Sequence, residues 1–217
     1  MSEEKEGKTP GGFLRKGQWA GLAIVVAGGA AALLIHSYLL RKPSVPGAPS
    51  PPALWRVPDF SLVSEQGKTV TLKDYAGTVW IADFIFVQCG GSCPLMTSRM
   101  SALTSTLRGT GVKFVSFDVD PDRDGVPQLL AYSQGAGADP SRWSFLRGEK
   151  PVIRALAREG FKLAVQDGDP KDPEPVLHST RFVLVDGTGT IRGTYDSLDE
   201  EKMAALLADA RRVAETK

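Results

Sequence analysis

Apolar residues are most continuous near the N-terminus of the chain. Residues 18–40 contain no Asp, Glu, Lys or Arg, and a helix of about 20 apolar residues crosses the roughly 30 Å hydrocarbon core of a bilayer. Basic residues flank both ends, and Trp19 and Tyr38 stand where interfacial aromatic side chains are found. The segment is too long for an ordinary cleaved signal peptide. We therefore predict an uncleaved transmembrane signal-anchor helix over residues 18–40.

The segments on either side of this predicted span are polar. Residues 1–17 are predicted to be a charged N-terminal tail, and residues 41–56 a proline-rich, extended linker. Four basic residues precede the span and three follow it within the linker, which favours an N-terminus in the cytoplasm or matrix. Residues 57–217 are then expected to form a globular domain on the opposite side of the membrane.

From Val57 onward, short apolar runs alternate with helical patterns. Residues 79–87 are almost continuously apolar, as in a central strand that is covered on both faces. Further strands are predicted over residues 69–72, 113–117, 161–165, 181–185 and 190–195, and helices over residues 94–107, 126–134, 152–158 and 197–213. A β-α-β unit followed by a hairpin and a helix predicts a thioredoxin-like α/β sandwich with a central mixed sheet flanked by helices.

Two end signals refine these elements. Asp186 to Gly189 read as the turn of a hairpin between the last two strands. Ser197 and Glu200 have the spacing of a capping box at the start of the last helix.

Charge and cysteine content limit the possible functions. The chain has 26 Lys and Arg against 25 Asp and Glu, so it has no broad electrostatic field that would attract nucleic acid. Its two cysteines are too few for a disulfide scaffold and too close in sequence to join distant elements. They are more typical of a reactive pair.

Cys89 and Cys93 lie between the predicted central strand and the helix that follows it, where ligands gather in open α/β sheets. The helix terminus is expected to stabilise a thiolate and lower its pKa. Residues four apart on a helical turn have Cβ atoms about 5–6 Å apart, so the sulfurs could share a metal ion or form a disulfide. Gly90 and Gly91 give the loop freedom for either. The alternative is a pair of buried cysteines that serve as small apolar residues.

His178 is the one histidine outside the predicted membrane span, within which His36 is expected to be a neutral side chain without a ligand role. In a thioredoxin-like sheet the loop entering the 181–185 strand runs beside the cysteine-bearing helix. Two thiolates and one imidazole suit copper(I), and hold copper(II) with an added oxygen ligand. Zinc would need a fourth ligand that the sequence does not obviously supply.

Other candidate ligands are weaker. Met96 and Met100 fall on a similar face of the predicted helix and are better explained by burial against the sheet. The run from Asp120 to Gly125 imitates an EF-hand loop, but Ala131 holds the position of the bidentate glutamate, which argues against calcium. The polar 166–175 segment reads as a solvated loop, or as a flap that delivers the histidine.

Two aspartates of the same region have expected structural roles. Asp118 is expected to end its strand near the site. Asp124 is expected to cap the helix that begins near Val126.

Four runs carry a family resemblance: VPDFSLVSEQGKTVTLKDYAGTVWIADFIF, CGGSCP, DVDPDRDGVPQLLAYSQ and HSTRFVLVDGTGTIRGTY. Over residues 57–210 the chain resembles the Sco/SenC family of copper chaperones for cytochrome c oxidase. The resemblance implies that Cys89, Cys93 and His178 are the ligands of one copper ion. It also implies that the domain faces the periplasm, or the intermembrane space of a mitochondrion, and that the client is the copper-centre subunit of the oxidase. Val87 and Leu177 depart from the family pattern, which usually has a polar residue at the first position and often an aspartate at the second.

Three functions compete on this reading. Thiol peroxidases of this fold carry a Pro-xxx-Thr/Ser-xx-Cys motif that the residues before Cys89 lack. A membrane-anchored thiol-disulfide oxidoreductase using Cys89 and Cys93 remains the alternative, although such enzymes usually have CxxC spacing. The favoured hypothesis is a copper metallochaperone, whose partners would include other copper chaperones or thiol reductases.

Overall fold

The computed structural model describes residues 49–167 and 176–216, with the backbone alone for residues 167 and 176–178. The predicted tail, the predicted span and the first half of the predicted linker lie outside these ranges. Within them, the structure contains no helix that is long and apolar enough to cross a bilayer.

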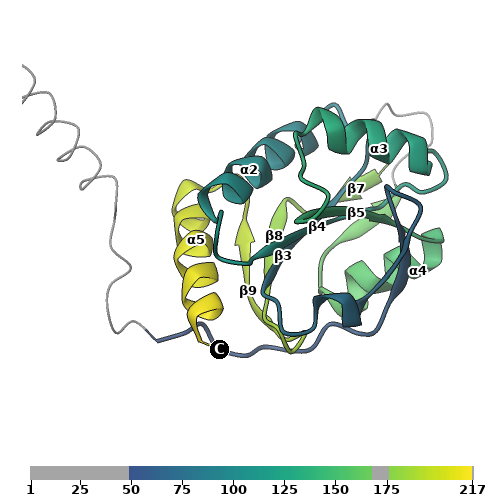
Figure 1. Ribbon diagram of the computed structural model, residues 1–217. Coiled ribbons are helices and arrows are strands. Elements are labelled where there is room, and N and C mark those ends of the chain that lie inside the picture. The colour runs from purple at the N-terminus through teal and green to yellow at the C-terminus, as the bar shows by residue number, and fades with distance from the viewer. Residues whose placement is uncertain (1–48, 168–175, 217) are drawn as a thin grey trace, which may run out of the picture. The chain divides into compact units, whose positions relative to one another are not determined.

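A seven-stranded mixed sheet forms the centre of the described domain, in the order β2-β1-β5-β4-β3-β8-β9. Its strands are β1 (Ser61–Ser64), β2 (Thr69–Thr71), β3 (Trp80–Ile85), β4 (Lys113–Asp118), β5 (Trp143–Arg147), β8 (Arg181–Val185) and β9 (Ile191–Asp196). The helices are α2 (Cys93–Thr106), α3 (Val126–Gly135), α4 (Lys150–Ala155) and α5 (Glu200–Glu215), with short turns η1 (Leu72–Tyr75) and η2 (Leu156–Gly160). A separate ladder pairs β6 (Val165–Asp167) with β7 (Val176–His178). The helices α2 and α3 lie over one face of the large sheet and α4 over the other, which confirms the predicted α/β architecture (Figure 1).

Strand pairing brings three chain segments to one edge of this sheet. β4 runs parallel to β3, and its last residue, Asp118, pairs with Ile85 at the end of β3. β8 runs antiparallel to β3, so the residues before Arg181 approach the same edge. We call this the thiol edge, because Cys89 follows β3 there.

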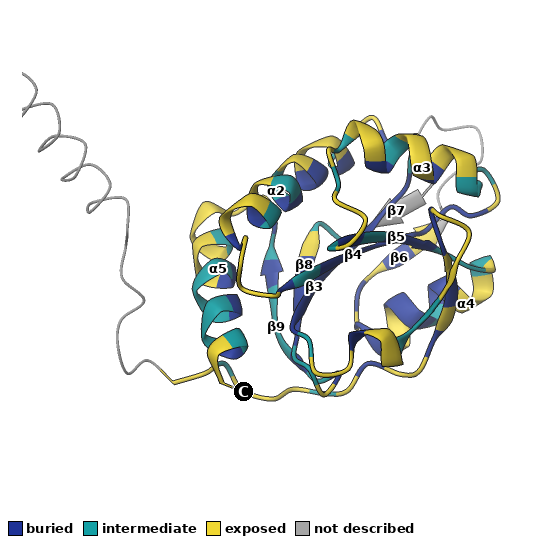
Figure 2. Ribbon diagram, in the orientation of Figure 1, coloured by how far each residue is buried: buried dark blue, intermediate teal, exposed yellow. Residues whose placement is uncertain are grey.

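The two faces of the sheet differ in chemistry. Side chains alternate along a strand, so Trp80 and Phe84 point to one face and Asp83 to the other. On the first face Phe84, Phe117 and Phe161 pack with ring centroids 5.0 to 5.4 Å apart. We call this the aromatic face, and the opposite side, beneath α2 and α3, the polar face. Strand β3 is buried along its whole length, as predicted for a central strand (Figure 2).

Residues 161–165 do not form the predicted strand, which begins only at Val165 as β6. The amides of Phe161 and Leu163 donate to Leu156 and Ala157 and so close the turn after α4. Lys162 between them has φ of 57°, which is incompatible with extended backbone. Strands β1 and β5 were also not predicted.

Both predicted helix caps are wrong in detail. The N-cap of α5 is Asp199, whose side chain accepts from the amides of Glu201 and Lys202, whereas Ser197 is buried before the helix. The N-cap position of α3 is Gly125. Asp124 instead accepts a hydrogen bond from the amide of Val87.

Part of the predicted linker pairs with the domain. The amide of Leu54 donates to Ile191, and the amide of Ile191 donates to Trp55. Arg56 forms a bridge with Thr190. Residues upstream of Val57 therefore pack as part of the domain.

Candidate metal centre

The cysteines lie where the chain passes from β3 into α2. β3 ends at Ile85, and α2 begins at Cys93 with Pro94 in its first turn, where a missing amide costs no helical hydrogen bond. Cys89 lies within the loop, not on the helix. The amide of Cys89 closes a turn by donating to the carbonyl of Phe86 over 3.4 Å.

The structure brings the two thiols together. The amide of Cys93 donates to Sγ of Cys89 over 3.4 Å, so the first turn of α2 directs a backbone N–H at that sulfur. Cys93 is completely buried and Cys89 is 8% exposed. The two cysteines are not joined by a disulfide in this structure. Both cysteines are therefore buried, and Cys89 is the more exposed residue of the two.

The pKa of Cys93 is raised, opposite to the expectation for a thiol at a helix N-terminus. The main cause is its hydrogen bond to the Cys89 side chain, and burial adds to it. A hydrogen bond from the Phe86 backbone acts in the other direction. The proximity of the second sulfur therefore outweighs the helix terminus at this position.

Two polar residues, one on β3 and one on α3, were not singled out from the sequence. Asp83 is fully buried in the middle of β3, and its charge contributes to the raised pKa values of Cys93 and Tyr132. The Tyr132 hydroxyl lies 2.7 Å from the Thr97 hydroxyl. Burial raises the pKa of Tyr132 to about 12, so it stays neutral at physiological pH. An aspartate inside an otherwise apolar strand was the available signal for Asp83.

Carboxyl groups accumulate beside the thiol loop. Asp118 ends β4 at the thiol edge, as predicted, and both it and Asp124 are completely buried. Burial raises the pKa of Asp118 from its ordinary value of 3.8 to about 8, and the charges of Asp124 and Asp120 raise it further. Burial also raises the pKa of Asp124, against the hydrogen bond from Val87.

His178 is the last residue of β7, where it pairs with Val165. It lies three positions before Arg181, the first residue of β8. Since β8 begins at the thiol edge, His178 is close in sequence to a residue at that edge. Its side chain is outside the described part of the structure. Among the described side chains, no three His, Cys, Asp or Glu residues are grouped as metal ligands.

The remaining sequence candidates have structural partners. Met96 and Met100 are fully buried in the core, which confirms the packing interpretation. Asp120 pairs with Arg123. The carboxylate of Asp122 lies 3.3 Å from the ammonium of Lys150.

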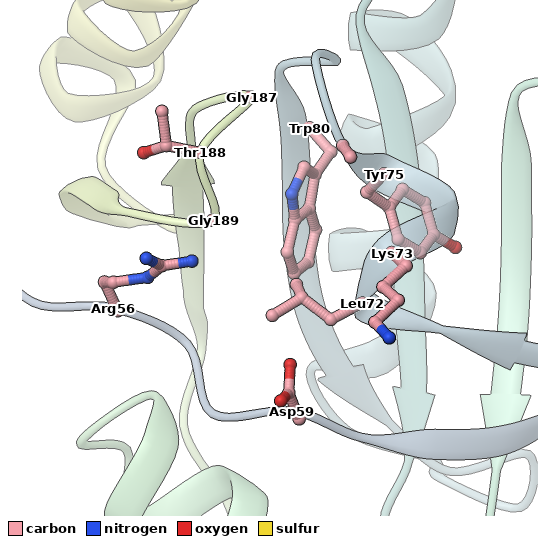
Figure 3. Close-up of a pocket in the computed structure, with 10 residues that line it drawn as sticks. Arg56, Asp59, Leu72, Lys73, Tyr75, Trp80, Gly187, Thr188 and Gly189 are labelled. Carbon is pink, nitrogen blue, oxygen red and sulfur yellow. The ribbon is translucent and has the colours of Figure 1, made fainter.

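A cavity of about 200 Å³ lies at the opposite end of β3. It is bordered by Trp80 at the first position of β3 and by the hairpin turn between β8 and β9 (Figure 3). Its other lining residues are Arg56, Asp59, Leu72, Lys73, Tyr75 and Ala76. None of its described lining residues is a cysteine or histidine. The two thiols meet at the thiol edge, where we place the candidate metal centre.

The strand order and the dithiol loop at the start of α2 define a thioredoxin-like protein with paired thiols at the edge of its sheet. The family model SCO1/SenC matches residues 51–215, and the chain therefore belongs to the SCO1/SenC family. The SCO1 protein homolog of Bacillus subtilis is 31% identical over 163 residues, which are 74% of this chain and 83% of that protein.

Solved structures agree with this assignment. BsSco, a member of the Sco family of cytochrome c oxidase assembly proteins in which a disulfide switch is identified, has 29% identity and a TM-score of 0.68 over 78% of this chain and 99% of its own. Arabidopsis thaliana ScoI with copper bound shares the fold, with 24% identity and a TM-score of 0.62 over 71% of this chain and 98% of its own.

Proposed function

We propose that this protein is a copper metallochaperone that binds one copper ion through Cys89, Cys93 and His178 and delivers it to the dinuclear copper centre of cytochrome c oxidase. The observation that carries the proposal is the contact between the Cys93 amide and Sγ of Cys89, because it holds two soft donors together beside a buried strand end. Two thiolates with one imidazole form a donor set suited to copper(I).

The partial burial of the pair supports transfer as well as binding. Cys93 is inaccessible, whereas Cys89 retains a narrow exposure, so a ligand of the client can reach the metal from one side. Exchange of copper between thiolates then proceeds by replacing one sulfur at a time. Both thiols lose their protons when the metal binds.

A thiol-disulfide role of the same pair is the second candidate, and the proximity of the two sulfurs favours it. A thiolate attacks a disulfide sulfur of the client, a mixed disulfide forms, and the second cysteine of the pair releases the reduced client as it forms the intramolecular disulfide. This pair would supply two electrons to the client and end as a disulfide. The disulfide form would lack the thiolates that bind copper.

The predicted anchor would confine this chemistry to the membrane that contains the oxidase. A tethered domain gains effective concentration near a membrane-bound client. The proline-rich residues 41–56 would set its distance from the bilayer. We further propose that the domain faces the periplasm or the intermembrane space.

The direct test is a copper(I) titration of the reduced full-length chain against a chromophoric copper(I) chelator. We expect one copper ion per chain, a loss of affinity above about 100-fold in Cys89→Ser and Cys93→Ser, and an altered copper(II) spectrum in His178→Ala. His36→Ala is the matched control, because it removes the other histidine of the chain. An unchanged spectrum in His178→Ala would exclude this histidine as a ligand.

Delivery is tested separately in cells that lack the endogenous gene. Oxidase copper content should return with the wild-type chain and not with Cys89→Ser. If Cys89→Ser also restored a copper-loaded oxidase, neither metal delivery nor thiol exchange through this pair would be its function.

A further inference from the structure

Asp124, one of the two buried carboxyl groups beside the cysteine loop, is hydrogen-bonded to the backbone of that loop. It is fully buried, and its Oδ2 accepts a 2.8 Å hydrogen bond from the amide of Val87, two residues before Cys89. The two residues are 37 positions apart in sequence. This is a long-range tie between a carboxylate and the backbone at the start of the loop.

The peptide unit that Asp124 holds also contacts the first cysteine. The carbonyl of Phe86 accepts from the amide of Cys89 over 3.4 Å, while the amide of Val87 donates to Asp124. The two polar groups of one peptide unit thus bind the backbone of Cys89 and the side chain of Asp124. Fixing the Val87 amide restricts the rotation of the Phe86–Val87 peptide, and through it the placement of the loop against Cys93.

The turn that carries Asp124 is itself held in place. Arg147 on β5 donates from Nε to the carbonyl of Asp124 over 2.9 Å and from Nη2 to the carbonyl of Pro121 over 2.8 Å. The amide of Asp124 donates to the carbonyl of Asp120 over 3.0 Å. The carboxylate therefore extends from a turn that is held by these hydrogen bonds, so its position is fixed independently of the cysteine loop.

The loop needs such a brace because of its composition. Gly90 and Gly91 follow Cys89, and glycine loses more conformational freedom on ordering than any other residue. A metal site of two sulfurs requires both to be held at the right separation, and outer groups that fix the ligands typically change metal affinity by about 10–100-fold when removed.

Resting on the proposed copper-binding function, we propose that Asp124 is a positioning residue of the metal centre, which fixes the Cys89 loop through the Val87 amide and is braced by Arg147. This role differs from the helix cap that the sequence predicted for Asp124. It assigns the second half of the DVDPDRD run to the geometry of the thiols.

Three variants of the full-length chain test the proposal. Asp124→Ala removes the acceptor and should weaken copper(I) binding about 10–100-fold, change the thiolate-to-copper(II) absorption band, and speed hydrogen exchange of the Val87 amide. Asp124→Asn retains an acceptor oxygen and should restore most of the affinity. Arg147→Met keeps the aliphatic stem but loses both hydrogen bonds, and should shift the same three readouts in the same direction by a smaller factor.

Two controls separate positioning from general destabilisation. Asp122→Ala removes an exposed carboxylate of the same turn and should leave copper binding unchanged. Leu206→Ala removes a fully buried side chain of α5 and should lower the melting temperature without changing the copper(II) band. If Asp124→Ala is too unstable to purify, Arg147→Met and the Val87 exchange rate in Asp124→Asn still decide the question.

The outcomes are distinct. Failure of the wild-type chain to bind copper would overturn the proposed function. Wild-type binding with unchanged affinity and spectrum in Asp124→Ala and Arg147→Met would overturn the positioning role alone. Equal losses of copper(I) affinity in Asp124→Ala and Leu206→Ala, with an unshifted copper(II) band, would likewise show that Asp124 has a purely structural role.

Discussion

The two faces of the central sheet use burial for different purposes. On the aromatic face, Phe84, Phe117 and Phe161 contact one another and bring no ionisable group into the core. On the polar face and at the thiol edge, the same sheet buries Asp83, Asp118 and the two thiols. Burial of apolar rings stabilises the fold, whereas burial of carboxyls opposes it. The aromatic face therefore contributes apolar packing alone through these rings, whereas the other side combines apolar packing, such as the stacked aromatic rings of β5, with buried carboxyls and thiols.

The largest effect should follow from opening the aromatic face. Phe161 is fully buried against Phe84 and Phe117, and a Phe→Ala change in a core typically costs about 3–5 kcal/mol. Phe161→Ala should therefore lower the free energy of unfolding by that amount in urea denaturation while the copper(I) affinity of the folded protein stays unchanged. Val152→Ala on α4, where the residue is 44% exposed, is the control and should change little. A parallel loss of copper affinity in Phe161→Ala would break the separation between the faces.

The next effect concerns the pH dependence that the thiol edge imposes. The pKa of Asp118 is raised from 3.8 to about 8, mainly by burial. Between these values the native state retains a proton that the unfolded chain releases, so the unfolding free energy falls as the pH rises. Asp118→Asn keeps an acceptor for the Asp120 amide, which donates to Asp118 over 3.0 Å, but removes the titration. We expect its stability to decline less than that of the wild type between pH 4 and pH 8.

The control for this pH series is Asp122→Asn, because the Asp122 side chain is 65% exposed. Its stability should follow the wild-type curve at every pH. A wild-type curve that rises between pH 4 and pH 8, with Asp118→Asn rising less, would reverse the assignment of the protonated state to the native Asp118.

A third prediction concerns the difference in exposure between the two thiols. Cys89 retains 8% exposure and Cys93 has none, and reagents attack accessible thiols first. Brief treatment of the reduced native chain with iodoacetamide should label Cys89 about tenfold faster than Cys93. Peptide mapping by mass spectrometry measures the ratio, and the urea-unfolded chain, in which both thiols are accessible, serves as the control. Preferential labelling of Cys93 would contradict this order, because it would mean that the loop shields Cys89 more than the start of α2 shields Cys93.

The sequence predicted the elements whose signal is long and local. The apolar run at residues 79–87 became β3, and the 94–107 pattern became α2, with Pro94 in its first turn. It did not predict β1 and β5, which have four and five residues and whose pairing depends on strands that are distant in sequence. The sequence also placed Cys89 and Cys93 correctly at the end of β3, because they directly follow the apolar run that predicts this strand.

The energetics of the site could not be read in the same way. The expected lowering of thiol pKa considered the helix terminus alone, whereas the raised pKa of Cys93 depends on the Cys89 sulfur and on burial. Asp124 was assigned to the nearest helix because local capping is the common role of such a residue. Its partner, Val87, lies 37 residues away, and no local pattern encodes that contact.

The smallest effect should come from a carboxylate that shares the thiol edge but stays in water. β9 runs antiparallel to β8, with Asp196 beside Arg181, so α5 starts at this edge. Its N-cap, Asp199, is exposed and accepts from the amides of Glu201 and Lys202 at 2.8 and 3.2 Å. Unlike Asp118, it meets helical N–H groups without losing its hydration.

Removing such a cap typically costs about 1 kcal/mol, so Asp199→Ala should lower the unfolding free energy by that amount in urea denaturation and leave copper affinity unchanged. Ser197→Ala is the matched control, because Ser197 was the predicted cap but makes no cap hydrogen bond in the structure. A larger loss in Ser197→Ala than in Asp199→Ala would restore the capping box that the sequence predicted. It would also mean that the exposed Asp199 and the buried Asp118 do not differ in their effect on the stability of the protein.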